Sequence, residues 1–318
     1  FSLACLKKGF KVVGIDNFSN STAKNVNIIK EMYPDDFSFI EADLAIDFEE
    51  VFAKLNQIEI SIVVHFAGLK AVGESQVFPF KYWENNLVST MNLIKFMTKK
   101  NIRKLIFSSS ATVYGNSEIQ PLTESNSIQP TSCYGSTKIA NEFFLHDIAN
   151  NDEIDVISLR YFNPVGSHKE KIIYEEFDQS PNNLMPRILR VAKGLDEKLL
   201  IFGNDYDTND GTGERDYIHI DDLIEAHIKS IEKIAALKGY NFFNIGTGIK
   251  HSVLELVSTF EKANNLKISY EFAKRRDGDV PVCFANPSKA EKILKWKAKI
   301  LFLKCAKTLG MQLKNYES

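Results

Sequence analysis

The chain has 318 residues, and its 39 Lys and Arg residues nearly balance its 41 Asp and Glu residues, for a formal net charge of -2. This length is typical of two domains, and the neutral charge balance argues against a nucleic-acid partner. Hydrophobic residues make up 44% of the chain, as in ordinary globular proteins. No run reaches the roughly 18 apolar residues of a membrane-spanning helix, so we expect no membrane partner. The four cysteines lack C-x-x-C spacing, which predicts a reducing, cytoplasmic location.

Short β-branched runs alternate with helical stretches over much of the chain. A helix over 2–8 comes first and ends at Gly9. Predicted strands then cover 11–15, 37–41, 61–66, 103–108 and 155–160, and the clearest helices between them cover 77–99 and 134–150. This alternation predicts an α/β fold with a Rossmann-like, doubly wound parallel sheet.

The rhythm of strands and helices changes at about Asn163, where prolines and glycines begin to punctuate the chain. We therefore predict a dinucleotide-binding domain over 1–164 and a smaller C-terminal α/β substrate domain over 165–318. We expect the two domains to be partly interleaved.

Tyr134 and Lys138 are four residues apart in the predicted helix 134–150, so they share one face of it. Ser108, Ser109 and Ser110 follow the predicted strand upstream. A tyrosine with a reference pKa of about 10 is a poor base near neutrality, and a pKa about 3 units lower requires about 4 kcal/mol of phenolate stabilisation. A neighbouring ammonium and a positively charged nicotinamide ring can supply this jointly. The pair alone is a weak signal, because any Tyr and Lys at helical spacing match it.

Acidic and small residues end the other predicted strands. Asp16 follows the strand 11–15, where a carboxylate would hold the ribose hydroxyls of NAD and repel a 2′-phosphate. Asp43 follows the strand 37–41 and could flank the adenine. Each aspartate can equally be a turn or helix-cap residue. The small residues Ala67 and Gly68 would let a ligand approach the backbone closely.

Taken together, these residues resemble the extended short-chain dehydrogenase/reductase family, and most closely its UDP-sugar 4-epimerases. The resemblance extends from Asp16 to about Trp296, whereas the stretch from Lys297 lacks the tryptophan-bearing helix usual in relatives. The segments that carry it are 16–21, 65–75, 108–115, 160–166, 182–186 and 211–219.

The resemblance implies reversible 4-epimerisation of UDP-glucose and UDP-galactose, through a 4-keto sugar and with tightly bound NAD. Tyr134 would remove the proton of the sugar 4-hydroxyl, Ser110 would hydrogen-bond the same oxygen, and Lys138 would lower the pKa of Tyr134 and bind the nicotinamide ribose. Because NAD is regenerated in each cycle, no second substrate is needed. The resemblance also implies a homodimer, built from the two helices that begin near Trp83 and Tyr134.

Other family roles transfer position by position. The positions that match cofactor contacts are Asp16, Asn17, Phe18, Ser19, Asn20, Ser21, Asp43, Leu44, Phe66, Ala67, Gly68, Leu69, Lys70, Asn85, Ser110, Tyr134, Lys138 and Phe162. The positions that match UDP-sugar contacts are Lys70, Ser110, Tyr134, Asn163, Asn183, Leu200, Ile201, Phe202, Arg215, Arg276, Asp279 and Cys283. The two arginines suit a diphosphate because guanidinium groups bind oxyanions bidentately. The six histidines show no ligand spacing, so we predict no metal site.

Two details bear on the reaction and the sugar. The 4,6-dehydratases of this family carry an acidic pair directly after the serine turn, where this chain has Ala111 and Thr112, which cannot act as carboxylic acids. Cys283 stands where members restricted to UDP-glucose and UDP-galactose tend to carry tyrosine. It therefore predicts additional activity on UDP-GlcNAc and UDP-GalNAc, unless it is a small buried residue unrelated to specificity.

The start of the chain departs from the family, because no strand and no Gly-rich turn precede the helix over 2–8. That turn normally holds the pyrophosphate, and that strand lies centrally in the sheet. We therefore expect a gap in the sheet and favour an N-terminally incomplete copy of a working gene product. The alternative is a non-catalytic UDP-sugar-binding protein that cannot hold NAD. A one-way sugar-nucleotide oxidoreductase is a further alternative.

Overall fold

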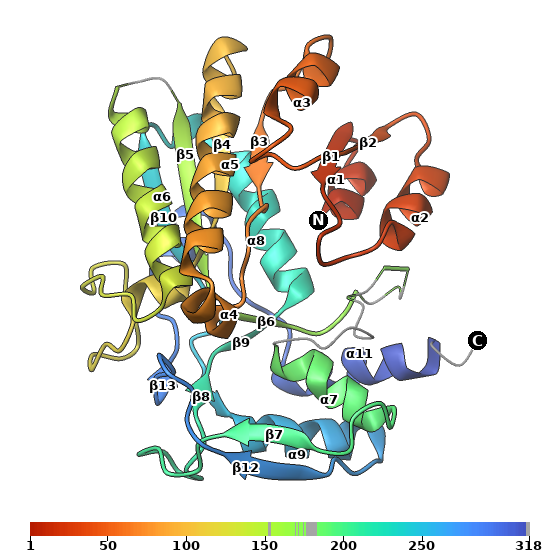
Figure 1. Cartoon of the computed structure of the whole chain (residues 1–318), viewed down its shortest axis with the longest axis vertical. Helices are drawn as coiled ribbons and strands as arrows, with labels where there is room; N and C mark the ends of the chain where they lie inside the picture. The colour runs from red at the N-terminus through yellow and green to blue at the C-terminus, as the bar shows by residue number, and fades with distance from the viewer. Residues whose placement is uncertain (152–153, 169, 171, 174, 176–182, 316–318) are drawn as a thin grey trace. The chain divides into compact units, whose positions relative to one another are not determined.

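The computed structural model of the chain describes residues 1–151, 154–168, 170, 172–173, 175 and 183–315 (Figure 1). It divides into two compact units, and the chain passes between them several times. Unit 1 takes in 1–109, 133–159 and 227–242, and unit 2 takes in the remainder. The expected division into a cofactor domain and a substrate domain stays a prediction. No helix among the described residues is both long and apolar enough to cross a membrane.

A small parallel sheet of two strands follows the first helix of unit 1. Helix α1 (Ser2–Lys7) ends just before Gly9, whose φ of +81° suits a residue without a Cβ. Strands β1 (Val12–Asp16) and β2 (Phe37–Glu41) pair in parallel, with α2 (Lys24–Met32) as the crossover. The expected helix and both expected strands are confirmed to within one residue.

A four-stranded sheet with the order β10-β5-β4-β3 forms the larger part of the α/β fold. Strand β3 (Val63–His65) pairs in parallel with β4 (Lys104–Ser110). The other two strands are β5 (Asp155–Tyr161) and β10 (Tyr240–Ile245). Within the described residues no hydrogen-bonded ladder joins this sheet to the β1–β2 pair, so the expected gap is confirmed.

Helices cover this sheet and bury the core of unit 1. The crossover from β3 to β4 contains α4 (Val72–Val77) and α5 (Pro79–Lys99), and α6 (Cys133–Asn150) runs beside α5 (Figure 1). A shorter helix, α3 (Phe48–Leu55), follows β2. The buried cluster includes Met97 of α5, Leu105 of β4 and Leu145 of α6, none of which is exposed to solvent. This core fixes α6 against β4.

Unit 2 contains small sheets of two or three strands with helices around them. Strand β8 (Glu214–Arg215) lies between β11 (His251–Ser252) and β13 (Val282–Cys283), β6 (Asn163–Val165) pairs with β9 (Tyr217–His219), and β7 (Leu199–Phe202) pairs with β12 (Tyr270–Ala273). The main helices are α7 (Leu184–Ala192), α9 (Val253–Asn264), α10 (Ser288–Ile293) and α11 (Phe302–Asn315). Helix α8 (Ile220–Lys233) begins in unit 2 and continues into unit 1.

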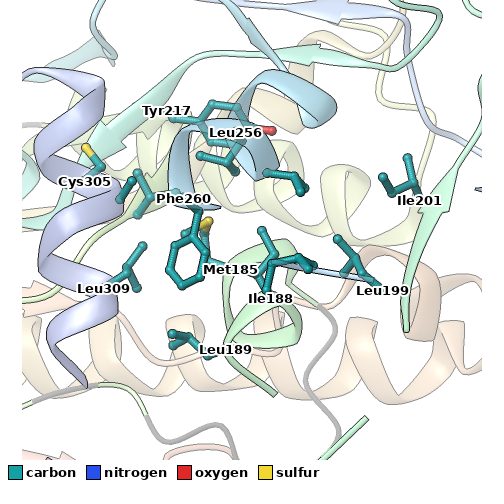
Figure 2. Close-up of a cluster of buried hydrophobic side chains, with 14 residues drawn as sticks. Met185, Ile188, Leu189, Leu199, Ile201, Tyr217, Leu256, Phe260, Cys305 and Leu309 are labelled. Carbon is teal, nitrogen blue, oxygen red and sulfur yellow. The ribbon is translucent and has the colours of Figure 1, made fainter. Parts of the chain in front are cut away.

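The core of unit 2 joins α7, α9 and α11 to β7, as Figure 2 shows. Leu256 and Phe260 of α9 are fully buried there, beside Cys305 and Leu309 of α11. The stretch from Lys297, which departs from the family pattern, therefore still supplies a helix to the core. Asp222 fixes its start, because the Trp296 indole donates to the Asp222 carbonyl at 2.9 Å.

Candidate active site

Lys138 lies buried between β4 and the first turns of α6. The residue is only 4% exposed, and its ammonium donates a hydrogen bond to the Ser108 carbonyl at 2.7 Å. The ammonium lies 5.0 Å from the centroid of the Phe107 ring and 5.8 Å from that of the Tyr134 ring. Burial lowers the pKa of Lys138 to about 8, and the carboxylate of Glu142 opposes that shift. The structure thus places a cation beside the phenol, as the helical spacing predicts.

Tyr134 is held at the N-terminus of α6 by its own backbone. Its N–H, which has no partner within the helix, donates to the Ser75 hydroxyl of α4 at 3.1 Å. Its carbonyl accepts a hydrogen bond from the Thr137 hydroxyl at 2.8 Å. These two bonds fix the position from which the phenol extends.

The loop after β3 approaches Lys138 closely. A Cβ at Gly68 would lie 3.1 Å from the Asn86 amide oxygen and 3.9 Å from the Lys138 ammonium nitrogen, and φ there is +148°. Asn86 accepts from the Leu69 N–H at 2.7 Å and donates to the Thr137 hydroxyl at 3.0 Å. Sequence reasoning selected the half-buried neighbour Asn85 and missed Asn86. Asn86 could have been identified as a polar amide on the buried face of the predicted helix 77–99.

His65 is the last residue of β3, and its side chain does not titrate near neutral pH. It is 3% exposed, and burial together with the nearby Lys138 charge lowers its pKa to about 3. One ring nitrogen lies 3.1 Å from the Thr90 hydroxyl. The histidine is therefore neutral across the physiological range.

The carboxyl ends of β1 and β2 meet at one edge of the small sheet, and polar side chains link them there. The Asn17 amide donates to the Asp43 carboxylate at 2.8 Å. The exposed Asp16 carboxylate accepts the Phe18 N–H at 2.8 Å through one oxygen, which leaves its other oxygen for a ligand. Phe18 has a φ of +50°, an unusual conformation for a bulky residue, and its ring stacks on Phe39 at 5.1 Å.

The remaining predicted cofactor positions are more dispersed. Phe66 is 43% exposed, and its ring contacts the rings of Phe1 and His227. Leu44 packs on the unit 1 core, and Phe162 is buried within unit 2. The positions exposed to solvent are Ser19, Asn20, Ser21, Ala67 and Lys70.

Ser110 is the last residue of β4, two positions beyond the carbonyl that holds Lys138. Its hydroxyl oxygen accepts the Thr112 N–H at 3.2 Å and the Thr112 hydroxyl at 3.0 Å. Both lone pairs of the Ser110 oxygen are therefore used, so its O–H is directed to an acceptor elsewhere. Ala111, which lies between the two residues, is buried.

Arginines and one buried phenol form a cluster in unit 2. The Arg276 guanidinium lies 4.8 Å from the Phe202 ring centroid and donates to Asp279 at 2.8 Å. Burial raises the pKa of Tyr206, and among the charges acting on that phenol are those of Asp279, Arg215, Arg275 and Arg276. The charges of the predicted residues Arg215 and Arg276 thus both act on Tyr206, and the Arg275 guanidinium lies 4.1 Å from the centroid of its ring. Tyr206 and Arg275 were missed, because only the folded chain brings 206 and 275 together.

Asp216 fixes the strand that carries Arg215. Its side chain is fully buried, and its carboxylate accepts from the Thr247 N–H and hydroxyl at 2.8 and 2.7 Å. The same carboxylate accepts from the Gly248 and Ala285 N–H groups at 2.9 and 3.2 Å. Burial raises the pKa of Asp216, whereas these donors lower it. Four donors on one carboxylate fix the residue that directly follows Arg215 at the end of β8.

Cys283 lies directly opposite Arg215, because β13 pairs with β8 in parallel. Burial raises the pKa of its thiol to about 11, with the Arg215 charge acting in the other direction. The thiol is therefore neutral near pH 7 and occupies less space than an aromatic side chain. Cys283 lies beside Arg215, which is a candidate for binding the diphosphate. This position would suit a residue that limits the size of the sugar site.

The other predicted sugar-nucleotide positions lie on several elements of unit 2. Leu200 and Phe202 point to one side of β7, whereas Ile201 points into the hydrophobic core and is 1% exposed (Figure 2). Ile201 could therefore contact a ligand only through its main-chain atoms. Asn163 donates its N–H to the Asp216 carbonyl at 3.0 Å, and the exposed Asn183 precedes α7. The first residue of the segment 182–186 lies outside the described residues.

Comparison with known proteins adds a family and several relatives. A family profile described as GDP-mannose 4,6 dehydratase matches residues 1–309. The chain is 48% identical over 295 residues to the UDP-glucose 4-epimerase of Bacillus subtilis, covering 92% of this chain and 87% of that protein.

Solved structures of related enzymes are also similar. The UDP-glucose 4-epimerase of Bifidobacterium longum, in complex with NAD+ and UDP, has a TM-score of 0.94 and 40% identity, covering 99% of this chain and 94% of that one. The UDP-Glc/GlcNAc 4-epimerase of Campylobacter jejuni has a TM-score of 0.79 and 33% identity, covering 97% and 94%.

The buried ammonium of Lys138 gives a stability prediction. Its pKa is lowered from 10.5 to about 8, so below pH 8 folding keeps a charge away from water, and this penalty fades as the pH rises towards 10.5. We expect wild type to gain on the order of 2 kcal/mol of stability relative to Lys138→Met between pH 7 and pH 10, because the methionine variant lacks this titration, whereas its loss of the charge opposite Glu142 counts at both pH values. Urea unfolding at both pH values measures the difference. The exposed Lys292→Met serves as control, and a stability difference between Lys138→Met and wild type that does not change with pH would contradict the prediction.

Proposed function

The chain belongs to the UDP-glucose 4-epimerase family, and we propose that it interconverts UDP-glucose and UDP-galactose, using NAD as its cofactor and the Tyr134–Lys138 pair as its acid–base group. The observation that carries the assignment of the pair is the position of the Lys138 ammonium, 2.7 Å from the Ser108 carbonyl and facing the Tyr134 ring. Lysine placed there lowers the cost of forming a phenolate.

The described residues of unit 1 suit both riboses of NAD. The free oxygen of the Asp16 carboxylate can accept the hydroxyls of the adenosine ribose, at the carboxyl edge of β1. Lys138 keeps further N–H donors after its bond to Ser108, and these can serve the hydroxyls of the nicotinamide ribose. When bound, NAD+ would supply the acceptor for a hydride from the sugar C4, and its reduced form would be the donor that restores the hydride on the opposite face.

Tyr134 and Ser110 divide the handling of the proton on the sugar 4-hydroxyl. The Tyr134 phenolate accepts that proton as the 4-keto sugar forms and returns it when the alcohol is restored. Lys138 stabilises the phenolate through its positive charge. The resemblance assigns the Ser110 O–H to the same sugar oxygen, and this donor stays available because Thr112 occupies both acceptor positions of the hydroxyl.

Unit 2 supplies the groups for the UDP moiety. Arg215 and Arg276 present guanidinium donors that match the geometry of a diphosphate, and Asp279 holds Arg276 in place. The roles of Asn163, Asn183, Leu200, Phe202 and the main chain of Ile201 rest on family resemblance and stay predictions.

The alternatives are less well supported. Relatives that cover almost the whole chain are named as epimerases, so a non-catalytic binding protein is not favoured. Although the matching profile describes a dehydratase, this chain has Ala111 and Thr112 where dehydration requires acids. A one-way oxidoreductase would accumulate reduced nicotinamide, whereas an epimerase returns the hydride.

Replacing Tyr134 by Phe tests the proposed reaction. Removal of the phenol oxygen should lower kcat for UDP-galactose by about 10²–10⁴-fold, because general acid–base catalysis is lost. Conversion to UDP-glucose is measured by chromatography, and NAD is measured after denaturation of the protein. The exposed Tyr270→Phe should retain full activity. Folded wild type that binds UDP, carries no NAD and shows no turnover would support the binding-protein alternative.

We also propose that UDP-GlcNAc and UDP-GalNAc are substrates, because Cys283 leaves space beside Arg215. A tyrosine at 283 would fill that space, so Cys283→Tyr should reduce kcat/KM for UDP-GlcNAc by at least about tenfold and change that for UDP-glucose much less. Cys133→Tyr is a matched control, because Cys133 is a half-buried thiol at the start of α6 in unit 1. If wild type ignores UDP-GlcNAc and Cys283→Tyr alters neither rate, the proposal is wrong.

A homodimer and a cytoplasmic location complete the proposal. Large apolar side chains are exposed on α5 and α6, where Phe80 is 78%, Phe143 61% and Trp83 39% accessible. Such side chains favour association with a second copy through the α5–α6 pair. All four cysteines are free thiols, as is usual in a reducing compartment.

Charges placed on this helix pair should dissociate the dimer. In the double variant Phe80→Asp/Phe143→Asp, each carboxylate would lose its hydration at the interface, so the chain should sediment as a monomer. Sedimentation equilibrium measures the mass. Ile119→Asp, at a position 73% exposed outside these helices, should leave the mass unchanged. A monomeric wild type would refute the proposed dimer.

A further inference from the structure

Glu142 is a buried acid that the proposed reaction does not use. The residue is 2% exposed and lies on α6, facing β4. The Ser109 hydroxyl donates a hydrogen bond to its Oε1 atom. A carboxylate is costly to bury, so a nearby positive charge would contribute to its stabilisation.

The spacing on α6 brings a cation to the same face of the helix as this acid. Tyr134, Lys138 and Glu142 follow one another at intervals of four residues and therefore share one face of the helix. Burial pulls the pKa of Lys138 down, and the Glu142 charge raises it. The cation at Lys138 thus lies between the phenol on one turn and the acid on the next.

The other groups around Lys138 leave Glu142 as its counter-charge. From β4 come the Phe107 ring and the Ser108 carbonyl, which are neutral. From β3 comes His65, whose pKa of about 3 keeps it uncharged through the working range. Asn86 of α5 contributes an uncharged amide near Gly68. Among the described residues that act on Lys138, Tyr134 and Glu142 are the ones that can carry negative charge.

We infer that Glu142 is a positioning residue for the acid–base pair: its carboxylate keeps Lys138 protonated and so sets the upper pH limit of the epimerisation. The inference rests on the proposed role of Tyr134 and Lys138. When Lys138 loses its proton, the phenolate of Tyr134 loses the charge that stabilises it, and the proton of the sugar 4-hydroxyl has no adequate acceptor.

The variant Glu142→Gln tests the inference, because it keeps an acceptor for Ser109 and removes only the charge. We expect the Lys138 pKa to fall by about 1–3 units, as when one close opposite charge is lost. The measurement is carbon NMR of protein labelled at the lysine ε-carbons, with the Lys138 signal identified by its absence from Lys138→Met. The alkaline limb of the kcat profile for UDP-galactose should move to lower pH by the same amount.

Two further variants separate charge from structure. Ser109→Ala removes the hydrogen bond and keeps the carboxylate, so it should leave the Lys138 pKa near its wild-type value. Glu142→Asp moves the carboxylate away from Lys138 by the length of one methylene, so the Lys138 pKa should lie between those of wild type and Glu142→Gln. This variant also tests the inference if Glu142→Gln does not fold. An unchanged Lys138 pKa in either Glu142 variant overturns the inference.

The NMR titration requires neither substrate nor NAD, so it stands independently of turnover. A Lys138 pKa that depends on Glu142 in a protein without epimerase activity would refute the proposed function and leave the electrostatic link intact. A normal epimerase with a Lys138 pKa independent of Glu142 would refute the link alone.

Discussion

One ammonium group buried between a strand and a helix is the interaction on which the candidate site depends. The Ser108 carbonyl, the face of Phe107 and the Glu142 carboxylate together offset the loss of water around Lys138. Each of these partners needs β4 and α6 to be in register, which the apolar cluster behind them ensures. In the proposed reaction this cation prepares Tyr134 for proton transfer, so the packing of unit 1 and its proposed chemistry share one arrangement.

The sequence predicted those features that depend on local spacing. Strand and helix periodicity placed β2 and α6 almost to the residue, and the interval of four residues identified Tyr134 and Lys138. It did not identify Asn86, whose partner Thr137 is 51 residues away, or the bond from Ser109 to Glu142, which spans 33 residues. These contacts arise from tertiary packing, and no short motif encodes them. Two-residue strands such as β8 and β13 are too short to show any period.

The turn after β4 illustrates how one fold serves different reactions. In this chain Thr112 orients the Ser110 hydroxyl through two hydrogen bonds, and Ala111 is buried beside it. An acidic pair at those positions would instead supply a second proton donor and favour elimination of water. The family pattern thus separates 4-epimerases from dehydratases by two adjacent side chains after the serine turn, and the fold alone does not identify the reaction.

The pairing of β8 with β13 has a consequence for how substrate range evolves. The Glu214 and Asp216 N–H groups donate to the carbonyls of Pro281 and Cys283, and Asp216 ties the same strand to the main chain at 247, 248 and 285. None of these bonds involves the side chain at 283. Under the proposed placement of Cys283 beside the sugar, point mutations there would enlarge or narrow the sugar pocket while Arg215 keeps its place. Selectivity for the sugar would then drift between lineages independently of nucleotide binding.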